Sequence, residues 1–178
     1  MNEKVKLVRM WIEDIVIGLN FCPFAKPVFD KEKIRYALSE DKDPTKILKF
    51  LDEELGFLHE KPKSELSTSI LILPAFKNFD DFLDHLALMD DYLDQTKYRG
   101  IFQLASFHPD YLFAEEEPES LSHYTNRSPY AIVHIIREEE IDVAVKFYKE
   151  VDSIPEVNKK TIEALGEEKL KKLLSKFR

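Results

Sequence analysis

Glycine is scarce in this chain of 178 residues, which contains only four. They lie far apart in the chain, as Gly18, Gly56, Gly100 and Gly166. A Walker loop or a dinucleotide-binding turn needs several glycines within a few residues, so neither motif is present. The sequence also lacks an HExxH motif and a serine in a GxSxG motif. These absences exclude nucleotide binding through those two turns and the familiar zinc-protease and α/β-hydrolase mechanisms.

Cysteine and long apolar segments are also nearly missing. Cys22 is the single cysteine, which excludes an internal disulfide framework and a zinc site built from several cysteines of one chain. In the first twenty residues, charged side chains interrupt the apolar positions, as Lys6, Arg9, Glu13 and Asp14. No signal-peptide core or bilayer-length segment is therefore expected, and we expect a cytoplasmic protein without a membrane partner.

The overall composition is that of a globular domain with an acidic surface. Apolar residues make up 44% and charged residues 34% of the chain, which is enough for one core. The formal net charge is -8 and the pI is near 5.2. Because binding to phosphate backbones needs a basic face, we do not expect nucleic acid as a partner.

Hydrophobic periodicity predicts an alternation of helices and strands. Spacings of three and four residues predict helices, and alternation or short continuous apolar segments predict strands. The expected helices cover residues 8–20, 43–58, 79–93, 138–151 and 158–177, and the expected strands cover residues 34–39, 68–74, 100–108 and 131–136. Asp43 and Asn78 are expected to cap their helices, and the strand 68–74, which contains a short continuous apolar run, is expected at the centre of the sheet.

This order predicts an α/β (α+β) fold. Right-handed crossovers make the first three strands parallel, and the fourth is expected to return antiparallel. The simplest arrangement is a two-layer sandwich, a four-stranded mixed sheet of ferredoxin-like character with additional N- and C-terminal helices. We expect a single domain over residues 1–155 and a C-terminal docking helix over residues 156–178, packed on the domain or on a second copy.

A connection of 23 residues, from His108 to Tyr130, separates the last two strands. Unstructured connections longer than about 15 residues are unusual in compact domains, and they tend to be functional or disordered. The acidic middle of this loop, residues 115–120, is expected to be exposed and mobile. Its two flanks carry aromatic and hydrogen-bonding residues and are expected to be anchored.

The flanks supply a candidate binding site. His108 and Tyr111 follow the third strand at its carboxyl end, where open α/β sheets gather ligand groups, and an antiparallel fourth strand would begin nearby. Arg127 could bind a carboxylate or phosphate, with Asn126 and Ser128 orienting it and His108 acting as acid or base. Alternatively, Asn126 and Ser128 satisfy backbone groups in a turn, and Arg127 pairs with a glutamate of the loop.

Cys22 is the candidate nucleophile. Lys26 nearby would favour a thiolate, whereas the negative end of the preceding helix would oppose it. A free cysteine is commonly a small buried apolar residue, and this structural interpretation is favoured.

Two further candidates lie on the fourth strand. For His134, also a candidate ligand-binding residue, a buried, hydrogen-bonded role is favoured over a catalytic or metal-binding one. Arg137 is a candidate ligand-binding residue, but a straight strand places it about 20 Å from Arg127. The sequence thus leaves open one composite site or two separate patches.

Three motifs occur in this order: CPFA near the N-terminus, FHPDYLF, and NRSPYAIVHIIRE after a variable loop. Together they resemble the pattern of a bacterial family of domains of unknown function. The resemblance runs from Trp11 to about Ala144, and the C-terminal helix from Asn158 falls outside it. Ala131 and Glu115 stand where the family pattern has proline and glycine. The matching positions, which suggest a shared site, are Cys22, Pro23, Phe24, His108, Pro109, Tyr111, Asn126, Arg127, Ser128, Pro129, His134, Arg137 and Glu138. No activity comes with the resemblance, and the cofactor stays unknown.

Two functional hypotheses follow. The first is a small cytoplasmic enzyme that acts on an anionic metabolite through Cys22, His108 and Arg127. The second is a non-catalytic interaction module whose polar motifs stabilise the long loop and whose C-terminal helix forms a homodimer contact. A third and weaker hypothesis is a metal site made of Cys22, His108 and His123.

Overall fold

A four-stranded mixed sheet forms the centre of the computed structural model, which describes residues 1–147 and 151–177. Its strands are β1 (Ile34–Leu38), β2 (Thr68–Leu73), β3 (Phe102–Phe107) and β4 (Ala131–Arg137), in the spatial order β1-β2-β4-β3. β1 and β2 are parallel, and β4 is antiparallel to both β2 and β3. The predicted α+β fold with a mixed sheet is therefore confirmed, including the antiparallel return of the fourth strand.

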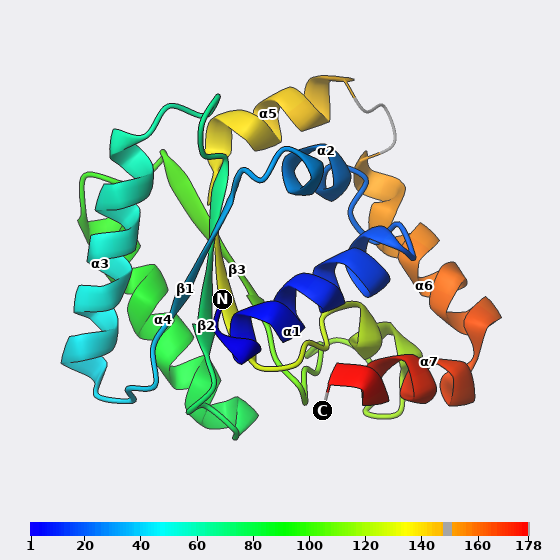
Figure 1. Cartoon of the computed structure of the whole chain (residues 1–178). Helices are drawn as coiled ribbons and strands as arrows, with labels where there is room; N and C mark the ends of the chain where they lie inside the picture. Colours follow the sequence, from blue (N-terminus) through cyan, green and yellow to red (C-terminus); the bar gives the residue numbers. More distant parts are fainter. Residues whose placement is uncertain (148–150, 178) are drawn as a thin grey trace.

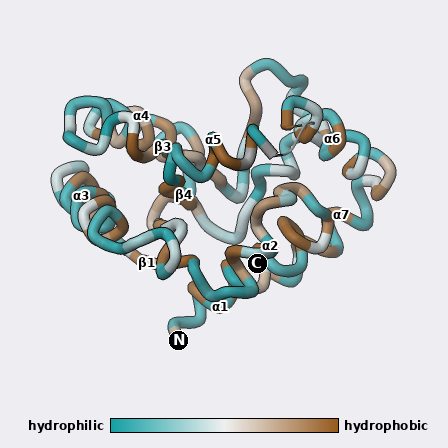
Figure 2. The backbone as a smooth tube through the Cα atoms, turned by 90° about the horizontal axis from the view of Figure 1, so that it is seen from above, coloured by the Kyte–Doolittle hydropathy of each residue, from teal (hydrophilic) through white to brown (hydrophobic). Residues whose placement is uncertain are grey.

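Helices cover both faces of this sheet (Figures 1 and 2). α3 and α4 pack on one face, and the N- and C-terminal helices pack on the other. The helical segments are α1 (Glu3–Trp11), the π-helix η1 (Ile12–Ile17), α2 (Ala25–Asp30), α3 (Pro44–Glu60), α4 (Phe79–Gln95), the 3₁₀ helix η2 (Leu121–Thr125), α5 (Glu138–Phe147), the 3₁₀ helix η3 (Val151–Ser153), α6 (Ile154–Leu165), α7 (Glu167–Leu174) and the 3₁₀ helix η4 (Ser175–Phe177). The terminal helices, expected beside a two-layer sandwich, thus supply a third layer.

The central strand and the helix caps follow from the sequence. All six residues of β2 are buried, because the strand lies between β1 and β4 and is covered by helices on both faces. Asp43 caps α3 by accepting a hydrogen bond from the Lys46 amide, over 3.0 Å. Asn78 caps α4 in the same way from the Asp81 amide, over 2.8 Å. Both predicted caps are confirmed.

The first helix changes its winding along its length. α1 continues into the π-helix η1, and the Gly18 amide donates to the carbonyl of Glu13, five residues earlier. A Cβ atom on Gly18 would lie 2.2 Å from the carbonyl oxygen of Asp14, so the tight exit from this helix requires glycine. The apolar stripe, which includes the buried Val8, Trp11 and Ile15, faces the sheet as predicted.

The C-terminal segment consists of two helices where one was predicted. Gly166, with φ of 78°, separates α6 from α7. Ile162, Leu170 and Phe177 are buried in the same core cluster as Val8, so this segment packs on its own domain. α6 begins at Ile154, close to the predicted boundary.

The helix predicted over residues 138–151 is α5 in its first part. Residues 148–150 lie outside the described residues. Within the part of the chain that the structure describes, no helix is both long and apolar enough to cross a bilayer.

Candidate functional site

The long loop folds back along the carboxyl end of β3. The His108 amide donates to the carbonyl of Asn126 over 3.2 Å, and the Ser128 amide donates to the carbonyl of His108 over 3.4 Å. The structure therefore brings His108 together with Asn126, Arg127 and Ser128, as the antiparallel return of β4 predicts. What each side chain can do depends on its own partners.

His108 is fully buried and both of its ring nitrogens have backbone partners. Nε2 lies 3.1 Å from the carbonyl oxygen of Phe76, and Nδ1 accepts a hydrogen bond from the Asp110 amide over 3.0 Å. This pattern requires the neutral tautomer with its proton on Nε2, and burial lowers the pKa of His108. The ring also stacks on Phe82, at 5.5 Å between centroids. His108 thus connects β3 to the segment after β2.

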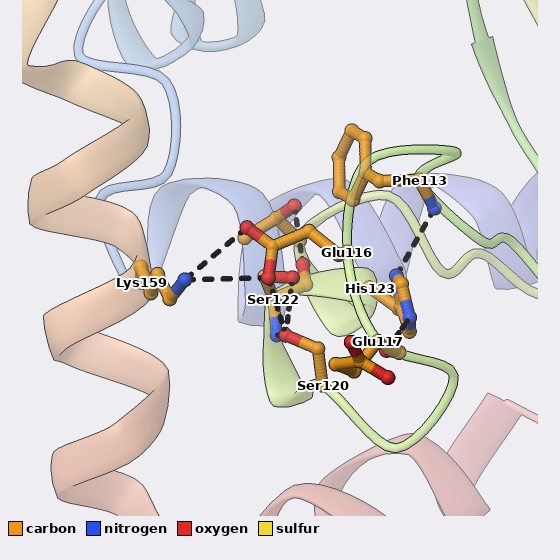
Figure 3. Close-up of polar contacts among 8 residues, drawn as sticks. Phe113, Glu116, Glu117, Ser120, Ser122, His123 and Lys159 are labelled. Carbon is orange, nitrogen blue, oxygen red and sulfur yellow. Dashed lines mark hydrogen bonds and ion pairs between the residues drawn. The ribbon is translucent and has the colours of Figure 1, made fainter.

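The middle of the loop is held by a second network, shown in Figure 3. His123 is fully buried, accepts from the Phe113 amide at Nδ1 over 3.1 Å, and contacts the carbonyl of Glu117 through Nε2 at 2.9 Å. Glu116 forms an ion pair of 3.1 Å with Lys159 of α6 and accepts from the Ser120 hydroxyl over 2.9 Å. The acidic loop is mostly exposed, as expected, but Glu116 attaches it to the C-terminal helices.

Asn126 and Ser128 hydrogen-bond to the chain itself. The Asn126 amide nitrogen Nδ2 donates to the carbonyl of Ser106 over 3.2 Å, and its Oδ1 accepts from Thr125 over 3.1 Å. The Ser128 hydroxyl donates to the carbonyl of Tyr130. These contacts match the structural alternative for the two residues, in which they satisfy backbone groups before β4.

Arg127 differs from its neighbours because its guanidinium is oriented without a carboxylate. Its Nε donates to the carbonyl of Tyr111 over 3.4 Å, and its guanidinium carbon lies 4.3 Å from the centroid of the Tyr124 ring. The Arg127 carbonyl accepts from the indole nitrogen of Trp11 over 3.0 Å. Among the described residues, no Asp or Glu forms an ion pair with Arg127, so the predicted pairing with a loop glutamate is not observed.

A small crevice opens beside Arg127, between the loop and the C-terminal helices. Its lining residues are Pro109, Arg127, Ser128, Pro129, Leu174 and Phe177. Its volume of about 10 Å³ has room for at most about one water molecule. Tyr111, predicted as a ligand-binding residue, supplies the carbonyl that orients Arg127, and its ring packs on Phe79 at 5.2 Å.

His134 lies on the sheet face that the terminal helices cover, in register with Ile70 of β2 and Ala105 of β3. Its Nε2 is 2.6 Å from the hydroxyl oxygen of Thr68, which donates its own proton to the carbonyl of Ile135. His134 is therefore the donor in this pair. Burial lowers the pKa of His134 to about 4, so the ring is neutral at physiological pH.

Arg137 caps a helix at the other end of β4. Its Nη2 donates to the carbonyls of Leu58, Lys61 and Leu66, around the carboxyl-terminal end of α3. The side chain is buried and also lies over the Phe102 ring at 5.6 Å. Arg137 and Arg127 thus belong to two separate patches at opposite ends of β4, which settles the question that the sequence left open.

Cys22 occupies the connection between η1 and α2. The residue is half-buried, and burial raises the pKa of its thiol, an effect that the amides of Phe24 and Ala25 oppose only in part. Within residues 1–147 and 151–177, no hydrogen bond or ring contact joins Cys22 to His108, and no group of three or more His, Cys, Asp or Glu side chains could hold a metal. The third hypothesis, a metal site of Cys22, His108 and His123, therefore has no geometric basis.

Two structural residues escaped the sequence analysis. The indole nitrogen of Trp11 fixes the loop at Arg127, although Trp11 stands in an apolar helical stripe. Glu54 is buried in α3, where it accepts from Arg35 over 2.7 and 2.9 Å and from Ser69 over 3.0 Å. Its position on the inward stripe of α3, three residues after Leu51 and four before Leu58, is a signal that could have revealed it.

A family model matches the chain over residues 3–172, and its description is protein of unknown function, DUF1415. The chain belongs to the DUF1415 family. The DUF1415 match includes all of α6 and most of α7, so the prediction that the resemblance stops near Ala144 was wrong. No curated protein and no solved structure matches the chain. Membership in DUF1415 therefore supports the predicted family of unknown function and leaves its activity to the site itself.

Proposed function

We propose that this protein is a binding domain for an anionic ligand, in which Arg127 binds the anion and the other polar motif residues hold the long loop in place. The observation that carries the proposal is the state of the Arg127 guanidinium. It is oriented by the Tyr111 carbonyl and the Tyr124 ring, yet it forms no ion pair with a carboxylate in the described part of the chain. A guanidinium that is oriented but not paired with a carboxylate favours anion recognition.

Preorganisation supports this role. The Trp11 indole fixes the backbone at Arg127. Its two neighbours are fixed by the backbone of His108, because the Asn126 carbonyl accepts from the His108 amide and the Ser128 amide donates to the His108 carbonyl. A guanidinium held in this way loses less conformational entropy when it binds a carboxylate or phosphate group. Lys171 of α7 adds a second positive charge, although Glu167 binds it over 2.6 Å and raises its pKa.

The dimensions of the crevice restrict the ligand. With about 10 Å³ beside Arg127, a whole metabolite cannot be enclosed. The ligand therefore presents one anionic group to Arg127 and leaves the rest of its structure at the surface. A phosphate or carboxylate on a larger molecule fits this description.

The catalytic version of the hypothesis has less support. His108 is neutral, fully buried and hydrogen-bonded at both nitrogens, so a substrate would have to displace a backbone group to use it as acid or base. Cys22 has a raised pKa, which opposes the thiolate that a nucleophile needs. Binding without chemistry is the simpler function for this geometry.

The version with a homodimer through the C-terminal helix has less support. Ile162, Leu170 and Leu174 of α6 and α7 are buried in the same core cluster as Val8 and Trp11, so this apolar stripe is covered within the chain. Loop stabilisation by the polar motifs, the other half of that hypothesis, is part of the present proposal.

Thermal unfolding with inorganic phosphate as the probe tests the proposal. Phosphate is titrated at constant ionic strength, with chloride as the balancing ion, in the parent, in Arg127→Gln and in Arg99→Gln. We expect the melting temperature of the parent and of Arg99→Gln to rise with phosphate. The phosphate-dependent rise in melting temperature should be absent in Arg127→Gln, which keeps most of the packing volume of arginine.

The increment with phosphate is compared within each protein, so a change in the starting stability of a variant does not affect the result. An equal increment in Arg127→Gln and the parent would show that phosphate binds elsewhere and would refute the proposal. An absence of any increment in the parent up to high phosphate concentration would refute it as well.

A further inference from the structure

β3 forms one edge of the sheet, with β4 on its inner side and no strand on its outer side among the described residues (Figure 2). The hydrogen bonds around it show which residues face outward. The Glu138 amide donates to the carbonyl of Ile101 over 2.9 Å, which extends the ladder with β4. Because alternate residues of a strand direct their backbone groups to the same side, Gln103 and Ala105 also bond to β4. Leu104 and Ser106 therefore direct their amide and carbonyl groups away from the sheet.

The chain itself covers both ends of this outer edge. At the start, the Phe102 amide donates to the carbonyl of Tyr98 over 3.2 Å, within a turn that also forms an isolated bridge between Arg99 and Phe102. At the other end, the Asn126 side chain donates to the carbonyl of Ser106 over 3.2 Å. These contacts agree with the assignment of the even-numbered residues to the outer side.

Between the two covered ends, three backbone groups remain open. The amide and carbonyl of Leu104 and the amide of Ser106 have no hydrogen-bond partner within the described residues. We name these three groups the β3 window. The strand sequence FQLASF contains no lysine or proline, and its register with β4 is continuous, so the features that usually prevent pairing at an edge strand are missing.

An open pocket of about 420 Å³ lies beside the β3 window. Leu93, Phe102 and Leu104 supply apolar lining, and Asp90, Asp94 and Glu138 supply carboxylates. Among the described residues, Arg99 is the one basic residue in the lining. The carboxylates of Asp94 and Asp91 help to raise the pKa of Asp90, an effect led by burial, which shows that negative charge is concentrated here.

We propose that the β3 window binds a short, extended, basic segment of another protein, which adds a strand to the edge of the sheet. Such a segment would pair its backbone with Leu104 and Ser106 and place alternate side chains in the pocket. An apolar side chain fits beside Leu93, and a lysine or arginine fits the carboxylates of Asp90 and Asp94. Because the β3 window extends from Leu104 to Ser106, the part of the bound segment that pairs with it is about three residues long.

Charge disfavours the simplest other occupant, a second copy of this chain paired through β3. Two copies would bring the carboxylates of both pockets close together, in a protein that already carries a formal charge of -8. A basic partner instead gains attraction from the same groups. The proposal is independent of Arg127, which lies beyond the covered end of the strand.

The test uses a synthetic hexapeptide of alternating lysine and valine, blocked at both termini, and a matched hexapeptide with glutamate in place of lysine. Binding is followed by amide chemical shifts and amide hydrogen exchange of the full-length protein. In the free protein the amides of Leu104 and Ser106 should exchange faster than those of Gln103 and Ala105. We expect the lysine peptide to shift and protect Leu104 and Ser106, and the glutamate peptide to leave them unchanged.

Variants separate the charge contribution from the backbone contribution. Asp90→Asn combined with Asp94→Asn should weaken binding of the lysine peptide about tenfold. Asp84→Asn, an exposed change on the same helix outside the pocket, should leave binding unchanged. Leu104→Pro removes the outward amide without removing a bond to β4, and it should abolish binding.

Three results would overturn the proposal. One is slow exchange of Leu104 and Ser106 in the free protein, which would mean that the edge is already covered. The second is equal binding of the lysine and glutamate peptides. The third is a concentration-dependent dimer in sedimentation velocity that protects the same two amides, which would assign the β3 window to a second copy.

Discussion

Nη2 of Arg137 lies 2.7 Å from the carbonyl oxygen of Lys61, the C-cap residue of α3, and the same nitrogen donates to the carbonyl of Leu58. A buried guanidinium thus satisfies carbonyls at the negative end of a helix. Replacing Arg137 by alanine removes this donor from the Lys61 carbonyl, whereas the Leu58 carbonyl still accepts from the Lys61 amide over 3.3 Å. We expect the free energy of unfolding to fall by about 3 kcal/mol, measured by urea denaturation.

Arg137→Lys is the matched variant for this contact. It keeps the positive charge but cannot bond several carbonyls from one planar group, so we expect a smaller loss than for alanine. Loss of ligand binding by Arg137→Ala without any loss of stability would contradict the structural role and would restore Arg137 to a binding site.

The pKa of His134 predicts a pH dependence of stability. An ordinary histidine has a pKa near 6.5, and burial lowers the pKa of His134 to about 4, so the unfolded chain binds more protons between these values. The contribution of His134 to stability is therefore complete above about pH 6.5 and is lost as the pH falls toward 4. At most about 3 kcal/mol should be lost, as measured by urea denaturation at several pH values.

His134→Gln isolates this contribution from that of His108, whose pKa is also lowered by burial. The difference in unfolding free energy between the parent and His134→Gln should change with pH over this interval. A chemical-shift titration that gives His134 a pKa near 6.5 would contradict the assignment.

The thiol of Cys22 should react slowly with alkylating agents. Burial raises its pKa, so the fraction of thiolate at pH 7.5 should be smaller than for a free cysteine. The rate of alkylation against pH measures this directly, since the protein has one cysteine. His108→Ala should leave the apparent pKa unchanged, and a lowered pKa that depends on His108 would revive the catalytic hypothesis.

Trp11→Phe tests the attachment of the loop. In the parent the ring centroids of Trp11 and Phe107 are 5.4 Å apart. The substitution keeps an aromatic ring beside Phe107 but removes the donor to the Arg127 carbonyl. We expect a loss of about 1 kcal/mol in unfolding free energy together with faster amide exchange at residues 126–128. Unchanged exchange in this segment would show that the indole hydrogen bond does not fix it.

Much of the fold could be predicted because local patterns determine it. The alternation in β1, the continuous apolar segment of β2 and the caps at Asp43 and Asn78 each depend on neighbouring residues. The division of the C-terminal segment was missed, because the apolar stripe continues across Gly166 although its backbone leaves the helical region. The N- and C-terminal helices together cover the sheet face opposite α3 and α4. Their packing depends on contacts between the two ends of the chain, which no local pattern encodes.

The candidate site was predictable in position and not in role. The topology brings His108 and the segment around Arg127 to the same edge, as sequence reasoning indicated. The roles depend on three-dimensional partners: the Phe76 carbonyl for His108, the end of α3 for Arg137, and Thr68 for His134. Each partner lies more than thirty residues away in sequence, so spacing alone could not distinguish a structural hydrogen bond from a ligand contact.

The most direct test of the account is the side-chain Nε–H resonance of Arg127, followed during a titration with inorganic phosphate at constant ionic strength. The account predicts a saturable shift of this resonance and none for Arg35, whose guanidinium is already paired with Glu54. Equal, non-saturating shifts at both arginines, or no shift at Arg127, would contradict an anion site at this position.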